Sequence, residues 1–380
     1  MSRRVMQPYL QALAQHFPIV SVIGPRQAGK RSLCFEAFPR SRYIDLERPD
    51  RREALREDPV AFLSRLPRGA VIDGGHRMPE LVPAAAEVVQ QQPVAGRFIL
   101  LGARPLLQAP SEVHGAHSRL WLLPLSLRER TVASMTLDEA MWTGGYPDLL
   151  SGRLPAQAWF ATYVGSFLDR DLRSLIDVAD PELFLRFFRA LAACTGELLN
   201  INGIAKDVGI AHGTARAWLA ALEAALLVLP APAWSAADQK RLVKARRLHL
   251  VDSGLACWLN GIKSPKELAR HPLRAGILQS FVWVELLKSQ LNRAAFPQLS
   301  HFRDRKGNAV DVVASDPPTA IQVITGTRVA SSLRTGMDRY AKRAGDCRRV
   351  CVHSGDALSS TNGIELWPWR ELDGLLTARA

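Results

Sequence analysis

Residues 19–33 read IVSVIGPRQAGKRSL, and this stretch decides how the N-terminal part of the chain is expected to fold. A short, apolar, β-branched run ends at Gly24, a glycine-containing loop follows, and a helix is expected after the loop. Gly24, Gly29 and Lys30 have the spacing of a P-loop, G-x-x-x-x-G-K-[ST], but Arg31 stands where that motif has serine or threonine. The stretch alone leaves three interpretations open: a working nucleotide site, a modified one, or a structural turn.

Further short buried strands are expected downstream, with helical stretches between them. The candidates are RYIDL (42–46), GAVIDG (69–74) and RFILLGA (97–103), and MPELVPAAAEVVQQQ (78–92) has a helical pattern. Strands that alternate with helices are typical of a parallel α/β sheet. We therefore predict a P-loop α/β domain over residues 1–150.

The middle of the chain, residues 151–265, is expected to be mainly helical. Residues 200–229 predict a short helix, a turn at Gly209 and a longer amphipathic helix from His212. This is a helix-turn-helix pattern, and RRLHLVD (246–252) can add a strand to make it a winged helix. We predict a helical and winged-helix region here.

The last part, residues 266–380, returns to mixed α/β character. A helical stretch over 277–291 precedes four apolar, strand-like runs, which are 300–304, 309–315, 319–325 and 348–354. The fold class predicted for the chain is therefore multidomain α/β.

The net charge and the distribution of apolar residues indicate where the protein is located and which partners it can bind. The 380 residues carry a net charge of +13, which favours a polyanion such as nucleic acid as partner, although a coding bias toward arginine gives the same excess. No apolar run reaches the roughly 20 residues that span a bilayer, and the N-terminus lacks the pattern of a signal peptide. We expect a cytoplasmic protein.

The five cysteines form an odd, scattered set and predict no disulfide framework. Cys347, Cys351 and His353 make the one tight cluster, but a metal site needs a further ligand. Because the surrounding RRVCVHS is strand-like, a structural role is the favoured interpretation and no metal site is predicted.

Along nearly its whole length the chain resembles a prokaryotic family of AAA+ P-loop ATPases with a winged-helix region and a C-terminal domain like a PD-(D/E)xK nuclease. The resemblance rests on eight segments in family order: FPIVSVIGPRQAGK (17–30), LPRGAVIDGGHRMPEL (66–81), GRFILLGAR (96–104), SRLWLLPLSLRE (118–129), GGYPDLL (144–150), TYVGSFLDRDL (162–172), KRLVKARRLHLVDSGLA (240–256) and HFRDRKGNAVDVV (301–313). It implies ATP as ligand, with Mg²⁺ in the intact members.

The departures from the family pattern fall on the groups that handle the metal and the attacking water. Arg31 replaces the threonine that coordinates magnesium, and Ser32 keeps a hydroxyl one residue later. Asp73 of the Walker B pair is kept, but Gly74 replaces the glutamate, and the sensor of the next strand ends in Ala103 without a hydroxyl. The groups that are kept still allow ATP binding, with a structural turn as the alternative, whereas Mg²⁺ is doubtful and efficient hydrolysis is not expected. The residues that the resemblance assigns to the nucleotide are Gly24, Gln27, Gly29, Lys30, Arg31, Ser32 and Asp73.

The nuclease-like domain shows parallel losses. Gln279 and Gln322 stand where the family has glutamates, Ile324 replaces the lysine, and Ala309 stands where an acid is common. Asp311 remains as a residual metal ligand or, as we favour, a polar residue in a strand. Metal-dependent cleavage is therefore not expected.

Basic residues are the remaining candidates for function. The start of the helix from His212 offers Arg216 to DNA, because Trp218, Leu219 and Leu222 form an apolar stripe that is most simply core. Residues 240–247 carry five positive charges that can contact phosphates or serve domain packing. These DNA candidates are Arg216, Lys240, Arg241, Lys244, Arg246 and Arg247, against the alternative of a solvated face.

Two further arginines match family positions that can reach a nucleotide. They are Arg119 and Arg170, either of which can act as an arginine finger, with a surface ion network as the alternative for Arg170. Three hypotheses follow: a DNA-associated pseudo-ATPase with an inactive nuclease-like domain, a slow but genuine Mg²⁺-dependent ATPase, and a protein-interaction scaffold.

Overall fold

The computed structural model describes residues 3–106, 115–152, 154–235, 242–326 and 330–377. The chain divides into two compact units, which are treated separately below. One contains residues 1–125 with the short segments 224–226 and 290–296, and the other contains the rest. The main segment of the first unit thus ends at residue 125, whereas the sequence predicted a boundary at residue 150. Most of the predicted regions 151–265 and 266–380 lies in the second unit.

The first unit is built on a five-stranded parallel sheet with the strand order β2-β3-β4-β1-β5. Its elements in chain order are α1 (Gln7–His16), β1 (Ile19–Ile23), α2 (Lys30–Ala37), β2 (Tyr43–Asp45), α3 (Pro49–Glu57), α4 (Pro59–Ser64), β3 (Ala70–Asp73), the 3₁₀ turn η1 (Gly75–Arg77), α5 (Leu81–Gln91), β4 (Phe98–Gly102) and β5 (His117–Trp121).

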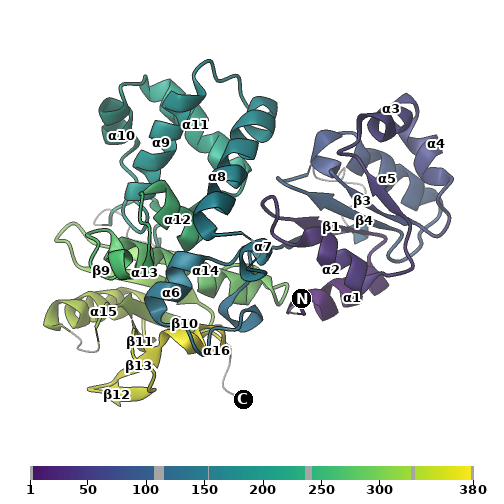
Figure 1. Cartoon of the computed structure of the whole chain (residues 1–380). Helices are drawn as coiled ribbons and strands as arrows, with labels where there is room; N and C mark the ends of the chain where they lie inside the picture. The colour runs from purple at the N-terminus through teal and green to yellow at the C-terminus, as the bar shows by residue number, and fades with distance from the viewer. Residues whose placement is uncertain (1–2, 107–114, 153, 236–241, 327–329, 378–380) are drawn as a thin grey trace. The chain divides into compact units, whose positions relative to one another are not determined.

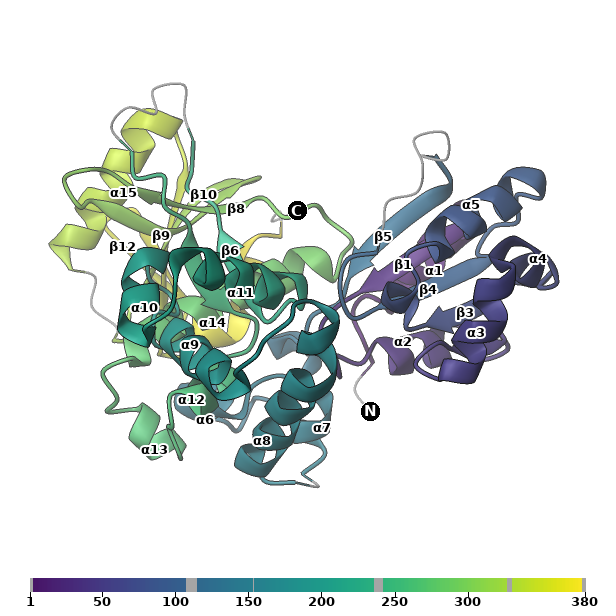
Figure 2. The same ribbon diagram turned by 90° about the horizontal axis from the view of Figure 1, so that it is seen from above.

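The strand β1 is fully buried in this sheet, next to β4 (Figure 1) on one side and β5 (Figure 2) on the other. Its Val20 and Val22 pack with Leu33 and Cys34 of α2 and with Leu10 of α1, so these helices cover one face of the sheet. Burying such β-branched and aliphatic side chains is the main favourable term in folding. The predicted parallel sheet is confirmed, and its strand ends carry the candidate site.

The second unit contains a helical part and a sheet. The helical part comprises the 3₁₀ turn η3 (Leu127–Glu129), α6 (Leu137–Thr143), α7 (Pro147–Leu150), α8 (Ala156–Ser166), the π-helical turn η4 (Phe167–Asp171), the 3₁₀ turn η5 (Leu172–Ser174), α9 (Pro181–Ala193), α10 (Ile201–Val208), α11 (His212–Ala224), α12 (Ser253–Leu259) and α13 (Pro265–Leu268).

Helices α10 and α11 form the expected helix-turn-helix pair, joined by a turn in which Gly209 has φ 81° (Figure 2). Trp218 of α11 packs against Phe184 and Phe187 of α9 at ring distances of 5.2 and 5.5 Å, which confirms the apolar stripe as core. Two antiparallel strands follow, β6 (Val228–Ala231) and β7 (Arg247–Leu250). The winged-helix assignment itself stays a prediction.

The sheet of the second unit has six strands in the order β12-β13-β11-β10-β9-β8. Its elements are α14 (Arg274–Leu291), β8 (Leu299–Arg303), β9 (Ala309–Ser315), β10 (Pro318–Val323), α15 (Ser331–Ala344), β11 (Arg348–His353), β12 (Ser359–Thr361), β13 (Ile364–Pro368), the 3₁₀ turn η7 (Trp369–Glu371) and α16 (Leu372–Leu375). Strands β10, β11 and β13 are parallel and the other pairs antiparallel, so this part is mixed α/β as predicted.

Among the described residues no helix has the length and apolar character that crossing a membrane requires.

Candidate functional site

The P-loop has the backbone conformation that its glycines predict. Gly24 follows β1 at a point where an added Cβ atom would lie 1.9 Å from the carbonyl oxygen of Leu122, so no other residue fits. Gln27 and Gly29 have φ angles of 58° and 93°, and α2 begins at Lys30. A loop that curls through positive φ before a helix N-terminus turns its N–H groups toward a bound anion.

The Lys30 ammonium group is folded back onto this loop. Its Nζ atom donates hydrogen bonds to the carbonyl oxygens of Gly24 and Pro25, both at 2.7 Å, and the residue is only 9% exposed. The carbonyl oxygens of the loop therefore hold the cation that a P-loop presents to phosphate.

The Arg31 guanidinium binds the retained Walker B aspartate. Its Nε and NH2 atoms lie 3.1 and 2.9 Å from one carboxylate oxygen of Asp73, and NH2 lies 3.5 Å from Asp45. Burial alone lowers the pKa of Arg31, but the hydrogen bond and charge of Asp73 outweigh burial, so the pKa is raised. Arg31 is thus a fixed cation on the carboxylate that supports magnesium in the family pattern.

Two neutral donors complete the surroundings of Asp73. The Tyr43 hydroxyl donates to the same oxygen at 2.6 Å, and the backbone N–H of Gly74 donates to the other at 2.8 Å. Burial and this contact with Asp73 raise the pKa of Tyr43, so the phenol stays protonated. Both carboxylate oxygens of Asp73 therefore already accept hydrogen bonds from the protein.

The positions of the catalytic glutamate and of the sensor hydroxyls carry other chemistry. Gly74 has φ 77°, and an added Cβ atom would lie 3.1 Å from the backbone nitrogen of Glu47. The backbone N–H of Ala103 donates to Nδ1 of His76 at 3.2 Å. Burial lowers the pKa of His76 to about 4, so the ring is neutral at pH 7 and its hydrogen lies on Nε2.

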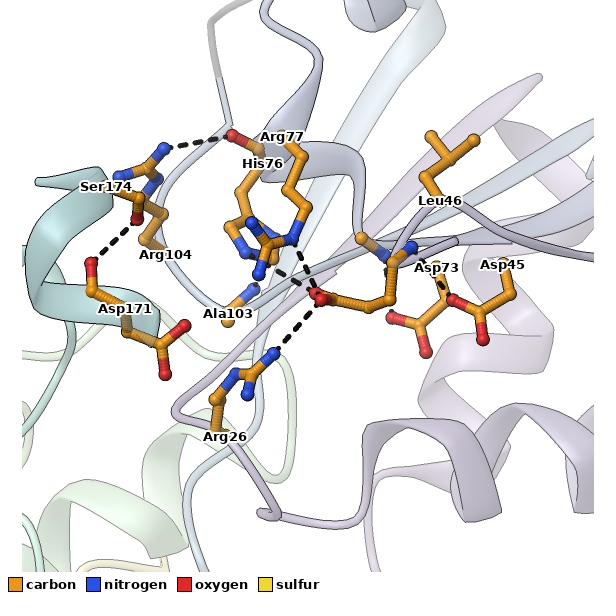
Figure 3. Close-up of polar contacts among 12 residues, drawn as sticks. Arg26, Asp45, Leu46, Asp73, His76, Arg77, Ala103, Arg104, Asp171 and Ser174 are labelled. Atoms are coloured by element: carbon orange, nitrogen blue, oxygen red, sulfur yellow. Dashed lines mark hydrogen bonds and ion pairs between the residues drawn. The ribbon is translucent and has the colours of Figure 1, made fainter. Parts of the chain in front are cut away.

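A second carboxylate, that of Glu47 just after β2, binds cationic side chains from other strand ends, among them Arg26 and Arg77, which are labelled in Figure 3. Its Oε2 atom accepts from NH2 of Arg26 in the P-loop at 3.1 Å and from Nε of Arg77 after β3 at 2.9 Å. Burial raises the pKa of Glu47, but the hydrogen bond from Arg77 and the charges of Arg26 and Arg77 outweigh burial and lower it.

Sequence reasoning missed this second cluster, as well as Tyr43 and Asp45. The strand RYIDL was predicted, and acidic residues at the carboxyl end of a strand in a parallel α/β sheet are a usable signal for a ligand site. The partners Arg26 and Arg77 could not be found from the sequence, because they come from different loops that the fold brings together.

The remaining residues that were predicted to contact a nucleotide lie in α2, the P-loop, β5 and the turn η4. Ser32 lies in the first turn of α2, half-buried, and Gln27 is exposed. Arg119 lies in the middle of β5 opposite Ser21 and is exposed, two residues before the level at which β1 ends. Arg170 is exposed in the π-helical turn Phe167–Asp171. Whether any of them touches a nucleotide stays a prediction.

The predicted DNA contacts divide into exposed and internal residues. Arg216, Lys244 and Arg246 are exposed, and Arg246 also pairs with Glu223 at 3.1 Å. Arg247 was wrongly placed in this set, because its side chain is 5% exposed and its NH1 atom lies 3.0 Å from Asp311. Lys240 and Arg241 lie outside the described residues.

Asp311, the residual metal ligand considered for the C-terminal sheet, is also occupied by the protein. Besides Arg247 it accepts the N–H of Val323 at 2.9 Å, and it is buried on β9. Gln322 donates to the carbonyl oxygen of Ala309 at 2.6 Å, and Gln279 is half-buried on α14. Within the described ranges no three histidine, cysteine or acidic residues group as metal ligands, and all five cysteines are free.

Two family models match the chain. Residues 16–131 match a family described as an AAA domain, and residues 134–266 match a domain of unknown function (DUF8612). Together with the P-loop geometry, the first match shows that the N-terminal part is an AAA-type ATPase-like domain. The second match supports neither the winged-helix nor the nuclease-like assignment, and both stay predictions.

Two curated relatives, from Mycobacterium bovis and Mycobacterium tuberculosis, carry the description "uncharacterized protein". Each is 32% identical over 292 residues, which is 75% of this chain and 65% of the relative. The matched stretch therefore spans just under two thirds of the length of these relatives.

Two solved structures are also similar. A Walker-type ATPase of Pyrococcus abyssi is 13% identical with a TM-score of 0.44, covering 68% of this chain and 95% of that one. A signal transduction ATPase with a tetratricopeptide repeat sensor, from Pyrococcus horikoshii, is 13% identical with a TM-score of 0.26, covering 77% and 48%.

Proposed function

We propose that the AAA domain binds a nucleoside triphosphate, with ATP as the expected ligand, without needing Mg²⁺ and with little or no hydrolysis. The observation that carries this proposal is the Arg31–Asp73 pair, in which a side chain of the P-loop helix occupies the Walker B carboxylate at 2.9 Å. A permanent cation thus stands beside the phosphate loop.

The groups available to a triphosphate are those that do not require a metal. The backbone N–H groups between Gly24 and Lys30 and the N-terminus of α2 favour an anion, as does the Ser32 hydroxyl. Lys30 can exchange its two loop carbonyls for phosphate oxygens, because both hydrogen bonds are to neutral acceptors.

The same residues do not fit Mg²⁺. The ion prefers six oxygen ligands in octahedral geometry, and here the threonine position carries Arg31 instead of a hydroxyl. The Asp73 oxygen that Arg31 and Tyr43 bind would have to give up both donors to reach a metal. Gly74 offers no side chain to orient the attacking water molecule. Hydrolysis needs both a metal ion on the phosphates and an oriented water molecule.

The direct test is ATP affinity and turnover of the full chain, each with EDTA and with Mg²⁺. We expect ATP binding in both conditions, no steady turnover, and loss of binding in Lys30→Ala. The matched control is Lys206→Ala, which changes an exposed lysine on α10 and should leave ATP binding as in the wild type. Turnover that depends on both Mg²⁺ and Lys30 would support a slow genuine ATPase instead. No binding would leave the loop as a structural turn.

For the rest of the chain we propose a DNA-associated role without metal-dependent cleavage. The exposed Arg216 at the start of α11 and the exposed Lys244 support the first part, and the Arg247–Asp311 pair supports the second. Affinity for duplex DNA should fall steeply with salt and weaken in Arg216→Ala. Salt-insensitive or absent binding would favour the protein-interaction scaffold.

A further inference from the structure

The Glu47 carboxylate lies where the ends of several parallel strands converge. Arg26 comes from the loop after β1, and Arg77 from the 3₁₀ turn after β3. The Nε2 atom of His76, in the same turn, lies 3.9 Å from Glu47. Ligands of parallel α/β sheets bind outside the carboxyl ends of the strands, so this cluster occupies a region where a bound anion is expected.

The two arginines are suited to exchange one anion for another. A guanidinium group binds a carboxylate and a phosphate through the same planar fork of donors. The side chains of Arg26, Arg77 and Glu47 are 27%, 23% and 29% exposed, so solvent and a ligand can reach the cluster. Arg26 belongs to the P-loop itself, four residues before Lys30.

We propose that Glu47 is an internal substitute for the terminal phosphate of a nucleoside triphosphate. Arg26 and Arg77 bind Glu47 when the site is empty and bind the terminal phosphate when a triphosphate is present. The inference rests on the nucleotide binding proposed above and names the residues that distinguish a triphosphate from a diphosphate. A diphosphate has no third phosphate to compete with Glu47, so it leaves both arginine contacts in place.

The exchange also affects the loop after β4. His76 accepts the N–H of Ala103, and the carbonyl oxygen of His76 accepts from NH2 of Arg104 at 3.2 Å (Figure 3). Glu47 is thus linked through the turn Gly75–Arg77 to the segment that carries the sensor in the family pattern. Release of Arg77 therefore alters the anchoring of that segment, which gives the domain a response to triphosphate without hydrolysis.

The test compares ATP and ADP affinities of the full chain in EDTA by titration calorimetry. Glu47→Gln keeps the shape of the side chain but removes the competing charge, so we expect ATP to bind about fivefold more tightly and ADP about as before. Glu87→Gln, an exposed position on α5, is the matched control and should change neither affinity. Arg77→Met and Arg26→Met should each weaken ATP more than ADP.

The outcomes separate this inference from the proposed function. If the wild type binds ATP through Lys30 but Glu47→Gln leaves the ratio of ATP to ADP affinity unchanged, the inference is wrong and nucleotide binding stands. If the wild type and the variants bind neither nucleotide, both proposals are wrong. Should Glu47→Gln fail to fold, as judged by circular dichroism, the two arginine variants decide, and an unchanged ratio in both contradicts the inference.

Discussion

At the residue scale, one substitution after the P-loop lysine changes the chemistry of the site. A threonine there offers an oxygen to a metal. Arg31 instead brings a positive charge, which lies 2.9 Å from the carboxylate of Asp73 and 3.5 Å from that of Asp45. Arginine stays protonated at every physiological pH, so this cation is permanent. This permanent cation is the basis for our proposal that the site attracts phosphate without arranging ligands around a divalent ion.

At Gly74, where the family pattern has the catalytic glutamate, the backbone conformation itself disfavours any side chain. Its φ of 77° costs about 1–2 kcal/mol for any residue with a Cβ atom, and that atom would lie 3.1 Å from the nitrogen of Glu47. We therefore expect Gly74→Ala to lower the free energy of unfolding by about 1–2 kcal/mol in urea.

The matched control for this change is Gly213→Ala in the exposed first turn of α11, where an added Cβ atom meets open space. It should be neutral or slightly stabilising. Equal effects of the two substitutions would contradict the conformational argument at Gly74.

At the element scale, the sheet of the second unit is joined to β7 by an internal ion pair. Arg247 of β7 and Asp311 of β9 are both almost fully buried and lie 3.0 Å apart. Removing one partner of such a pair leaves a buried charge, which costs about 3–5 kcal/mol. Asp311→Ala should therefore be strongly destabilising in urea unfolding, more so than the double variant Arg247→Met/Asp311→Leu. A double variant as unstable as Asp311→Ala would show that the pair does not act as a unit.

His301 of β8 gives this part of the fold a dependence on pH. Burial and the charge of Arg247 lower the pKa of His301 to about 4, while the ordinary value is 6.5. Between pH 6.5 and 4 the unfolded chain therefore binds a proton that the folded chain does not, so stability falls as the pH falls.

We expect His301→Gln to remove about 2 kcal/mol of the acid-induced loss between pH 6.5 and 4.5, while leaving its hydrogen-bond partner, the Ala245 carbonyl oxygen, with a donor. The measurement is the free energy of unfolding at pH 6.5 and 4.5 for both proteins. The same loss in the variant would contradict the assignment to His301.

The elements show what the sequence could predict. The strand IVSVI is fully buried and was predicted with the bounds that β1 has, as AVDVVAS was for β9. The edge strand β5, HSRLW, was missed because its first three residues are polar and only Leu120 is buried. The Glu47 cluster was missed for another reason, since its members lie far apart in the sequence and meet only through the sheet.

At the scale of the whole molecule, internal pairing changes how the net charge of +13 is interpreted. Arg31, Arg26, Arg77 and Arg247 all bind carboxylates of the protein, so the basic residues left for an external polyanion are fewer than the sequence suggested. The two aspartates that the family resemblance linked to metal sites, Asp73 and Asp311, each hold an arginine. This common pattern agrees with binding without metal chemistry.

The dependence of ATP affinity on Mg²⁺, measured for the wild type and for Arg31→Thr, tests this account most directly. We predict that the wild type binds ATP with about the same affinity in EDTA and in Mg²⁺, and that Arg31→Thr binds it about tenfold more weakly in EDTA than in Mg²⁺, since the hydroxyl frees Asp73 for the metal. Wild-type binding that requires Mg²⁺, together with steady turnover, would contradict the account.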